Sequence, residues 1–587
     1  MNIFKKYRKS IIITSIVLAS IVVIIFVFQL IIGNIIANKI ENALDKREDN
    51  QYKIKVGTVK VNLFTMTLIL KDLNVAPDSL YLDGMASKSV KQPDILRVKV
   101  PVLRIRNISI LKLIRDKFID VGSFVLKNAQ VDIYTDGKTV PSKDKKPKST
   151  SSLFNFDSIP LPGIGGGKIG ALKISEFGIN LINVNKGDTV VSANSLDLAL
   201  YDIELLKNEN DSTSFKLNLK DADFNMSNET FYLPGGNYIL SFKDMSFSMN
   251  KSLLVFDNLS IKPRYSRSKM VSLSKFQYEI YNVDIEKIEI NSINLKQIIR
   301  ESKFFFSSID VDNMKLNIFK DKHFPFDESK RPKLPQQMLK ALKKDLNIDS
   351  ITISNSELEY SELHELMKEP MIVTLGNFNV KVKNITSVVD SIINGAVMTI
   401  NLKANLQKTI PMAVDIAFPM KSIRDTFMFS GYLGKGEMKI FNPIVLPAIG
   451  IKFESGIIDK INFQATANPS YSIGSMTMLY HDLEGDIQRK DMVETNKFLS
   501  WVANSVLIQN NPAKDKDPRI VPLYFDRVMY KGFGNFLWKT LQSGITATLV
   551  PTMKNKVQGQ IDETKGTSNK DIRKREREEK KKNREDR

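Results

Sequence analysis

A 34-residue segment occurs twice in this chain of 587 residues, and its two copies align without a gap. Residues 103–136 read LRIRNISILKLIRDKFIDVGSFVLKNAQVDIYTD, and residues 288–321 read IEINSINLKQIIRESKFFFSSIDVDNMKLNIFKD. Apolar and polar residues alternate along both copies, and this period of two is typical of β-strands with one apolar face. Such a repeat predicts that one local β-structure is built twice.

The alternation slips by one residue at two equivalent places in each copy, near Asn107/Ser292 and near Asn128/Asn313. Because a one-residue slip moves every following side chain to the other face, each place predicts a bulge or a tight turn. Asparagine at the second place tolerates a left-handed backbone.

The match extends upstream, so that residues 68–136 and 253–321 are expected to share one fold. A Pro/Lys-rich linker follows each copy, over 137–168 and over 322–345, and a further strand pattern follows each linker. The sequence therefore predicts a mainly β fold built from duplicated strand units.

Few segments have helical character. Short helices are expected over 35–44, from Pro335, from Asp491, and over about 533–549. Pro335 suits the first turn of a helix, and Asp491 is followed three residues later by a glutamate, as in a capping box.

Residues 11–32 form a continuous apolar run, and no charged residue occurs between Lys9 and Lys39. Twenty-two residues at about 1.5 Å rise each give a helix of about 33 Å, enough to cross a hydrocarbon core of about 30 Å. A cleaved signal peptide would have a shorter apolar region, of about 7–15 residues. The run therefore predicts a retained transmembrane anchor. Four basic residues precede it, which predicts a cytoplasmic N-terminus and an exported body.

These observations divide the chain into six parts. They are a cytoplasmic N-terminus (1–10), the anchor (11–32), a juxtamembrane helix (33–50), a first β-repeat region (51–252), a second β-repeat region with C-terminal helices (253–550), and a charged, disordered tail (551–587).

The chain contains no cysteine, which excludes disulfides, thiolate catalysis and cysteine-ligated metals. Its formal net charge is +20, of which the first nine residues contribute +4 and residues 565–587 contribute +5. The remaining surplus of about +11 is spread over the body and does not form basic patches with interleaved aromatic residues. We therefore expect no nucleic-acid partner, and attraction to anionic lipid headgroups is the better interpretation.

No arrangement of residues predicts a catalytic, metal or cofactor site, and no enzymatic activity is expected. His323, His364 and His481 lie in different segments without metal-ligand spacing. Residues 165–170 match G-x-G-x-x-G formally, but they follow a linker and precede a strand, so we interpret them as a flexible loop. The glutamates over 357–369 are interpreted as a solvated face.

Together these features resemble the AsmA-like family of Gram-negative envelope proteins, within a wider group that includes TamB and YhdP. The resemblance rests on the single anchor, the strand-rich body and the repeated unit. It also rests on residues 474–483, GSMTMLYHDL, which look like the closing strand motif of that family. It covers roughly residues 1–550.

The resemblance implies a single-pass inner-membrane protein with a periplasmic body. Its elongated, antiparallel-rich β-sheet would curl into a groove. Its role would be to move phospholipid toward the outer membrane, or to maintain that membrane, and its expected partner is membrane phospholipid.

Alternation alone cannot distinguish an open groove from a closed β-sandwich, since both need one apolar face. An anchored β-sandwich scaffold or binding module is therefore an alternative. Another is an assembly factor that offers its strand edges to outer-membrane proteins. In these alternatives the partners are envelope or outer-membrane proteins.

The lipid-groove hypothesis predicts which side chains contact acyl chains. They are apolar residues that share one face in each copy once the second slip is allowed for. The candidates are Phe124, Leu126, Val131 and Ile133, with Ala129, in the first copy, and Ile309, Val311, Leu316 and Ile318, with Met314, in the second.

Overall fold

The computed structural model of the chain describes residues 52–77, 95–135, 159–160, 164–183, 188–208, 211–365, 367, 369–487 and 508–564. The anchor expected over 11–32, the helix expected over 35–44 and the helix expected from Asp491 lie outside these residues. Within the described ranges no helix is long and apolar enough to cross a membrane.

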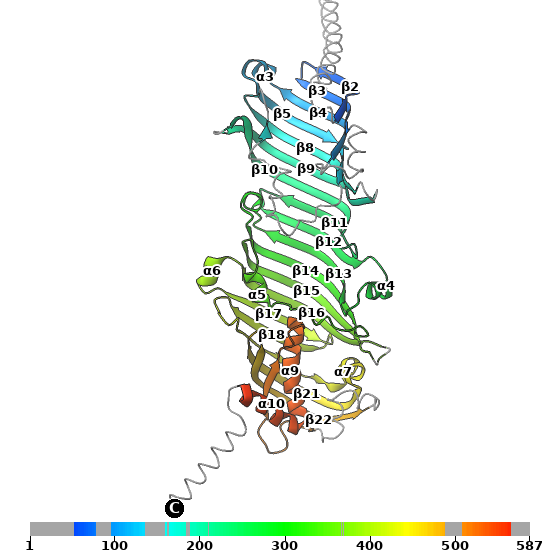
Figure 1. Ribbon diagram of the computed structural model, residues 1–587, viewed down its shortest axis with the longest axis vertical. Coiled ribbons are helices and arrows are strands. Elements are labelled where there is room, and N and C mark those ends of the chain that lie inside the picture. Colours follow the sequence, from blue (N-terminus) through cyan, green and yellow to red (C-terminus); the bar gives the residue numbers. More distant parts are fainter. Residues whose placement is uncertain are drawn as a thin grey trace, which may run out of the picture. The chain divides into compact units, whose positions relative to one another are not determined.

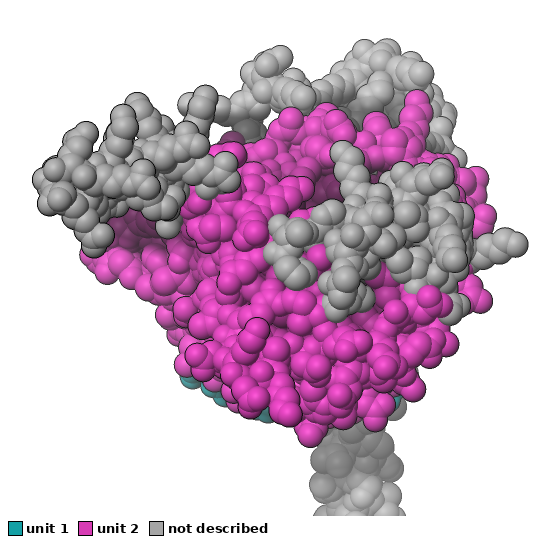
Figure 2. Space-filling model, turned by 90° about the horizontal axis from the view of Figure 1, so that it is seen from below, with its two compact units in different colours: residues 1–233, 240–254 teal, residues 234–239, 255–587 magenta. Residues whose placement is uncertain are grey.

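The described chain is mainly β, with few, short helices. It divides into two compact units, coloured separately in Figure 2: unit 1 comprises residues 1–233 and 240–254, and unit 2 comprises residues 234–239 and 255–587. The division crosses β11 (Tyr238–Ser248) and β12 (Leu253–Pro263). The mainly β class predicted from the alternation is confirmed.

Unit 1 contains a mixed sheet. Its strands are β1 (Tyr52–Lys55), β2 (Thr58–Asn62), β3 (Thr67–Pro77), β4 (Ile95–Ile108), β5 (Phe118–Lys127), β6 (Gln130–Thr135), β7 (Ile159–Pro160), β8 (Gly166–Asn183), β9 (Asp188–Asn208) and β10 (Asp211–Tyr232). β1 and β2 pair with one edge of β3, β4 pairs with its other edge, and β4 also pairs with β5 and β6. β8 pairs in parallel with β5 and β6 and antiparallel with β9, and β10 follows β9 (Figure 1).

Unit 2 continues this pattern over a longer series of strands. They are β13 (Glu279–Asn291), β14 (Phe304–Asp321), β15 (Leu346–Leu363), β16 (Met371–Thr386), β17 (Val397–Leu406), β18 (Ile410–Pro419), β19 (Phe427–Leu433), β20 (Gly436–Glu437), β21 (Ile451–Ala467), β22 (Tyr471–Ile487) and β23 (Ile520–Asp526). β14 and β15 are parallel, and the other pairs are antiparallel. β13 pairs with β14, and β15 to β19 pair in succession. β19 then pairs with β21, β21 with β22, and β22 with β23.

The parallel pairs occur where the two linkers were predicted. Parallel strands need a crossover of about a dozen or more residues, because the chain must return to the end at which the previous strand began. Residues 322–345 make this return between β14 and β15. The second linker is therefore a crossover, a role that alternation in the strands does not reveal.

The glycine-rich segment 165–170 is mostly strand, so its interpretation as a flexible loop is wrong, as is the expected linker end at residue 168. β8 begins at Gly166. A Cβ atom at Gly170 would lie 2.6 Å from the carbonyl oxygen of Gly122, and one at Gly165 would lie 2.5 Å from that of Asp116. Glycine is needed here because β8 and the residue before it closely approach β5 and the C-terminal end of the helix α3 (Ile110–Asp116).

The two copies of the repeated segment have the same strand order and nearly the same register. All but one of the pairs that β4 makes with β5 and β6 have a counterpart 185 residues later between β13 and β14. The pair Ile105–Phe124, for example, corresponds to the pair Ile290–Ile309. The common local fold expected from the alignment is thus present in the hydrogen-bonded pairing.

Both slips in the alternation contain a residue with left-handed backbone. The φ angle is 55° at Asn107, 64° at Ser292, 54° at Asn128 and 52° at Asn313. Such a residue interrupts the regular pleat, so the side chains that follow it change face relative to strict alternation.

Two predicted helices are present with the expected starts: α5 (Pro335–Lys340) and α9 (Phe533–Leu549). The remaining helical elements between strands were not anticipated, because each is too short to show a 3.6-residue period. They are α3 (Ile110–Asp116), α4 (Arg267–Ser272), η2 (Gln297–Glu301), α6 (Val389–Ile393), η3 (Met438–Phe441) and α7 (Asn442–Ile449).

The disordered tail predicted from residue 551 is wrong for its first part. Residues Pro551–Thr564 form α10, and the side chains of Val557 and Ile561 are buried. With Met553 these residues recur every fourth position, which places them on one side of a helix. The charged residues after Thr564 lie outside the described residues.

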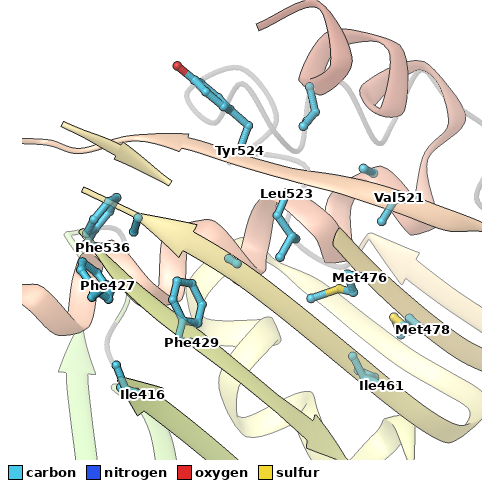
Figure 3. Packing of buried hydrophobic residues seen from close by; sticks show 14 of the residues in the cluster. Ile416, Phe427, Phe429, Ile461, Met476, Met478, Val521, Leu523, Tyr524 and Phe536 are labelled. Atoms are coloured by element: carbon cyan, nitrogen blue, oxygen red, sulfur yellow. The ribbon is translucent and has the colours of Figure 1, made fainter. Parts of the chain in front are cut away.

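Among the described residues, a large hydrophobic core lies in unit 2, where α9 and α10 pack on the later strands (Figure 3). Phe427 of β19 meets Phe536 of α9 edge to face, with ring centroids 6.2 Å apart, and it stacks on Phe418 at 5.2 Å. Ser472 and Thr540 join β22 to α9 by a hydrogen bond of 2.6 Å between their hydroxyls.

Candidate functional site

The eight candidate residues belong to rows of apolar residues that run across the sheets. A row is here the set of residues that pair with one another on successive strands. Paired side chains lie on the same face with Cβ atoms about 4.5–5.5 Å apart, so an unbroken apolar row is a continuous apolar stripe.

Row A of unit 2 contains Ile309 and crosses ten strands. It consists of Ile290, Ile309, Ile351, Val382, Ile400, Ile416, Phe429, Ala465, Gly474 and Leu523. Nine steps of about 4.8 Å between strands give a stripe of about 43 Å.

Row B runs beside row A and contains Val311. It consists of Ile288, Val311, Ile353, Val380, Leu402, Val414, Gly431, Phe463, Met476 and Val521.

Unit 1 has the equivalent two rows through Phe124 and Leu126. Row A is Val61, Leu68, Ile105, Phe124, Leu172, Leu200 and Ala222, and row B is Val59, Leu70, Leu103, Leu126, Ile174, Leu198 and Phe224.

The other four candidates lie beyond the second slip, in rows C and D. Row C is Val75, Val98, Val131, Ile179 and Ala193 in unit 1, and Val283, Leu316, Leu358, Leu375, Leu406 and Ile410 in unit 2. Row D contains Leu96 and Ile133 in unit 1, and Tyr281, Ile318, Tyr360 and Val373 in unit 2.

The residues between rows A and B in unit 2 point to the opposite face, and on β13–β19, β21 and β22 they are polar. They are Glu289, Asp310, Thr352, Lys381, Asn401, Asp415, Ser430, Gln464 and Ser475. Side-chain hydrogen bonds link some of them, such as the 2.6 Å bond from Asn401 to Asp415. Along rows A and B the unit 2 sheet is therefore apolar on one face and mainly polar on the other.

Most residues of rows A and B over β13–β17 are half-buried, whereas several on the later strands are buried. All eight candidate side chains are half-buried, neither exposed nor within the solvent-free core. By contrast Phe429, Met476 and Leu523, in the same two rows, are buried beneath α9 and α10. One continuous apolar face thus passes from a half-open stretch into a closed core.

The hydrophobic cluster around Met314 contains residues from one layer only. Its buried members are Met314, Phe378, Val380 and Ala404, and the apolar side chains packed against them all come from β13–β18. A β-sandwich would bring side chains of a second sheet into such a cluster. Among the described residues, no second sheet contributes to it.

A charged row borders row D on the apolar face of unit 2. Glu279 pairs with Lys320, and Lys320 with Glu362. The hydroxyl of Tyr281 donates to Glu279 at 2.6 Å, and that of Tyr360 to Glu362 at 2.8 Å. Burial, reinforced by these carboxylates, raises the pKa of both tyrosines, so both hydroxyls stay protonated as donors.

Four lysines gather at this border, and we call Lys320, Lys322, Lys531 and Lys539 the lysine cluster. The Nζ atoms of Lys320 and Lys531 lie 4.7 and 5.1 Å from the ring centroid of Phe326. Lys322 forms an ion pair with Glu362, and Lys320 lies 3.7 Å from Glu279.

The cluster has more positive than negative charge, because its four lysines face the two carboxylates named above. Burial lowers the pKa of Lys531 and of Lys539, and repulsion from neighbouring lysines lowers each further. A bound anion would relieve this repulsion. The pattern of alternation did not predict the cluster, because its members come from β14, the following loop and the distant α9 region.

No metal site is present in the described part of the chain: no group of three or more histidine or acidic residues there could hold an ion. His323 and His481 each contact a neighbouring aspartate, at 2.7 and 2.8 Å. Burial, together with Lys322, lowers the pKa of His364.

No protein-family model matches the chain, and no curated protein sequence matches it. The resemblance to the AsmA-like family therefore stays a prediction drawn from the chain's own residues.

Proposed function

We propose that the chain is an AsmA-like envelope protein, anchored in the inner membrane by residues 11–32, whose periplasmic body carries phospholipid between the inner and outer membranes. Its duplicated strand units would form an elongated, curled, groove-like sheet. The acyl chains would lie along rows A to D, and the role would be lipid transport or maintenance of the outer membrane.

The observation that carries this proposal is the half-buried apolar stretch around Met314, whose side chains all come from β13–β18 of one sheet. Exposing a two-chain lipid to water costs about 0.8 kcal/mol for each methylene group. A face with unbroken apolar rows removes much of this cost. Because hydrophobic contact has no preferred direction, an acyl chain can shift along a row without leaving a fixed site.

The charged border adds a place for the headgroup. An acyl chain on rows C and D of unit 2 would bring a lipid phosphate toward the lysine cluster, where positive charge is in excess. Lysine binds phosphate as a compact point charge with freely rotating donors. The polar and apolar parts of one lipid would thus meet matching surfaces.

The alternative of a closed β-sandwich scaffold predicts that the candidate side chains pack against a second layer. The cluster around Met314 argues against it for the stretch that it covers. An assembly factor for outer-membrane proteins would instead use strand edges, and it predicts a bound protein client.

The test is to purify the full-length chain in mild detergent and to measure co-purified phospholipid by mass spectrometry. Leu316→Asp and Val131→Asp place a charge on the apolar face, at a cost of several kcal/mol to a bound acyl chain. Asn317→Asp and Gln130→Asp are the matched controls, since both residues are exposed on the other face.

The proposal predicts that Leu316→Asp and Val131→Asp lose most of their lipid at near-normal melting temperature, while the controls keep it. Loss of cooperative unfolding in both variants would indicate a closed core and favour the scaffold. A folded wild-type chain without lipid would reject carriage, and a crosslinked protein client in its place would favour the assembly factor.

A further inference from the structure

Unit 1 exposes large apolar side chains at one corner of its sheet. Leu111 and Ile114 of α3 are 82% and 75% exposed, and Phe64, in the turn after β2, is 73% exposed. The turn and the helix are neighbours, because the backbone N–H of Ile108 donates to the carbonyl oxygen of Met66 at 3.1 Å. None of the residues of α3 is buried. We call Phe64, Met66, Ile110, Leu111, Leu113 and Ile114 the α3 patch.

The second copy of the repeat shows that this exposure is not required by the local fold. The position equivalent to Leu111 is Lys296, at the start of η2. Leu295 and Ile298, equivalent to Ile110 and Leu113, are half-buried. The same structural unit is thus built elsewhere with a lysine in place of Leu111 and with two of its apolar residues half-buried, so the α3 patch needs a separate explanation.

The patch lies at the N-terminal edge of the unit 1 sheet. β1 and β2 pair only with β3 among the described strands, and the turn containing Phe64 directly follows β2. Figure 1 shows α3, β2 and β3 at the same end of this sheet. The chain enters this edge at Tyr52, which pairs with Pro77 at the far end of β3.

The predicted anchor can reach this edge. β3 spans about 33 Å between the partner of Tyr52 and the turn, at about 3.3 Å per residue. Residues 33–51 lie between the predicted anchor and β1, and with the helix expected over 35–44 and the other nine residues extended they can span about 45 Å. The anchor and the α3 patch can therefore meet the same bilayer surface.

The charges around the patch also suit a bilayer surface. Lys112 and Arg115 lie among its apolar residues and Lys117 follows the helix; Lys112 forms an ion pair with Asp120 of β5, and Arg115 with the adjacent Asp116. Apolar side chains flanked by cations are typical of segments that lie in the interface of anionic membranes.

We propose that the α3 patch inserts into the surface of the phospholipid bilayer that holds the anchor, so that the N-terminal edge of the sheet is seated on the membrane. This inference rests on the proposed localisation. It would place the first strands, and with them the starts of rows A and B, at the lipid surface.

The absence of cysteine makes a direct test possible. Leu111→Cys and Lys296→Cys each give a full-length chain with one thiol, at equivalent positions of the two copies. Both chains are labelled with an environment-sensitive fluorophore and reconstituted into vesicles of phosphatidylethanolamine and phosphatidylglycerol. Quenching by spin-labelled acyl chains then reports contact with the bilayer.

We expect a blue shift and strong quenching at position 111, at least threefold greater than at position 296. Equal, weak quenching at both positions would overturn the proposal, and would leave a protein partner as the occupant of the patch. This readout is independent of lipid carriage, because a chain that carries no lipid can still seat its patch on the vesicle.

A second pair of variants separates insertion from mere nearness to the anchor. Quenching of a fluorophore at Phe64→Cys is measured in two chains, one with no other change in the patch and one that also carries Leu111→Lys and Ile114→Lys. Because residues 111 and 114 are exposed, the double change should leave the melting temperature unaltered. We expect it to reduce quenching at position 64 at least threefold, and undiminished quenching would overturn the proposal.

Discussion

Gly544 of α9 lies directly against Leu523 of β23, and no space for a side chain separates them. A Cβ atom at residue 544 would overlap the Leu523 side chain and stand 2.9 Å from Met476 Sδ. Leu523 is the last residue of row A, and Met476 belongs to row B. Glycine thus allows α9 to close the apolar face at this end of unit 2.

This contact predicts that Gly544→Leu destabilises unit 2. Overpacking a filled core costs about 1–3 kcal/mol, so the midpoint of denaturant unfolding should fall. Gly534→Ala in the same helix is the control, since a Cβ atom there meets no atom within 4 Å. It should raise stability slightly, because alanine is the better helix former. Equal effects of the two changes would show that α9 does not pack as described.

Tyr480 predicts a loss of stability at alkaline pH. Its hydroxyl donates to the carbonyl oxygen of Ile508 at 2.8 Å, and burial raises its pKa to about 12, from an ordinary 10. The raised pKa contributes stability that is present below pH 10 and is lost as pH rises to about 12. Tyr480→Phe should therefore be less stable by about 1 kcal/mol at neutral pH, with a smaller decline between pH 10 and 12. Parallel declines in both proteins would contradict the assignment.

The packing of α10 predicts that residues 551–564 contribute to folding. Ile561 is buried in the unit 2 core, so Ile561→Ala should cost about 2–4 kcal/mol. Lys556→Ala changes an exposed residue of the same helix and should stay within about 0.5 kcal/mol of wild type. Thermal unfolding distinguishes the two, and an unaltered melting temperature for Ile561→Ala would mean that α10 is detached.

The left-handed backbone at Asn313 predicts that a glycine variant at this position is more stable than a valine variant. With φ at 52°, Asn313→Val should cost about 1–2 kcal/mol, because a β-branched residue strongly resists this conformation. Asn313→Gly should be tolerated better, although it loses the contact with Glu286. Denaturant unfolding measures both. Equal stability of the valine and glycine variants would show that residue 313 does not adopt the left-handed conformation.

The lysine cluster predicts selectivity for anionic lipid. Lys531→Gln with Lys539→Gln should lower the ratio of anionic to zwitterionic phospholipid that co-purifies, while total lipid changes less. Lys340→Gln is the control, because Lys340 pairs with Asp425 away from the cluster. An unchanged ratio in the double variant would remove the cluster from the headgroup site.

The same double variant should also change how the stability of the folded chain depends on pH. Because the pKa values of Lys531 and Lys539 are lowered, the folded chain binds fewer protons than the unfolded chain just below pH 10.5. The contribution of these two lysines to the free energy of unfolding therefore increases as pH rises toward 10.5. Replacing them with glutamine should remove this rise without lowering stability at pH 7.

Much of the β-structure was predictable from local pattern. Period-two alternation identified strands, and the slips at Asn128 and Asn313 located left-handed residues, because a one-residue shift is visible in the order of apolar residues. The helix over 533–549 was predictable because seventeen residues show a clear helical period. The eight candidate residues could be placed on one face for the same reason.

Tertiary structure decided what the pattern could not contain. Alternation is a property of one strand, so it is the same whether the apolar face is half-open, as at Leu316, or covered by a helix, as at Leu523. The parallel pairing of β14 with β15 depends on where the 322–345 crossover returns. The lysine cluster joins residues that lie more than two hundred positions apart, and only folding brings them to one border.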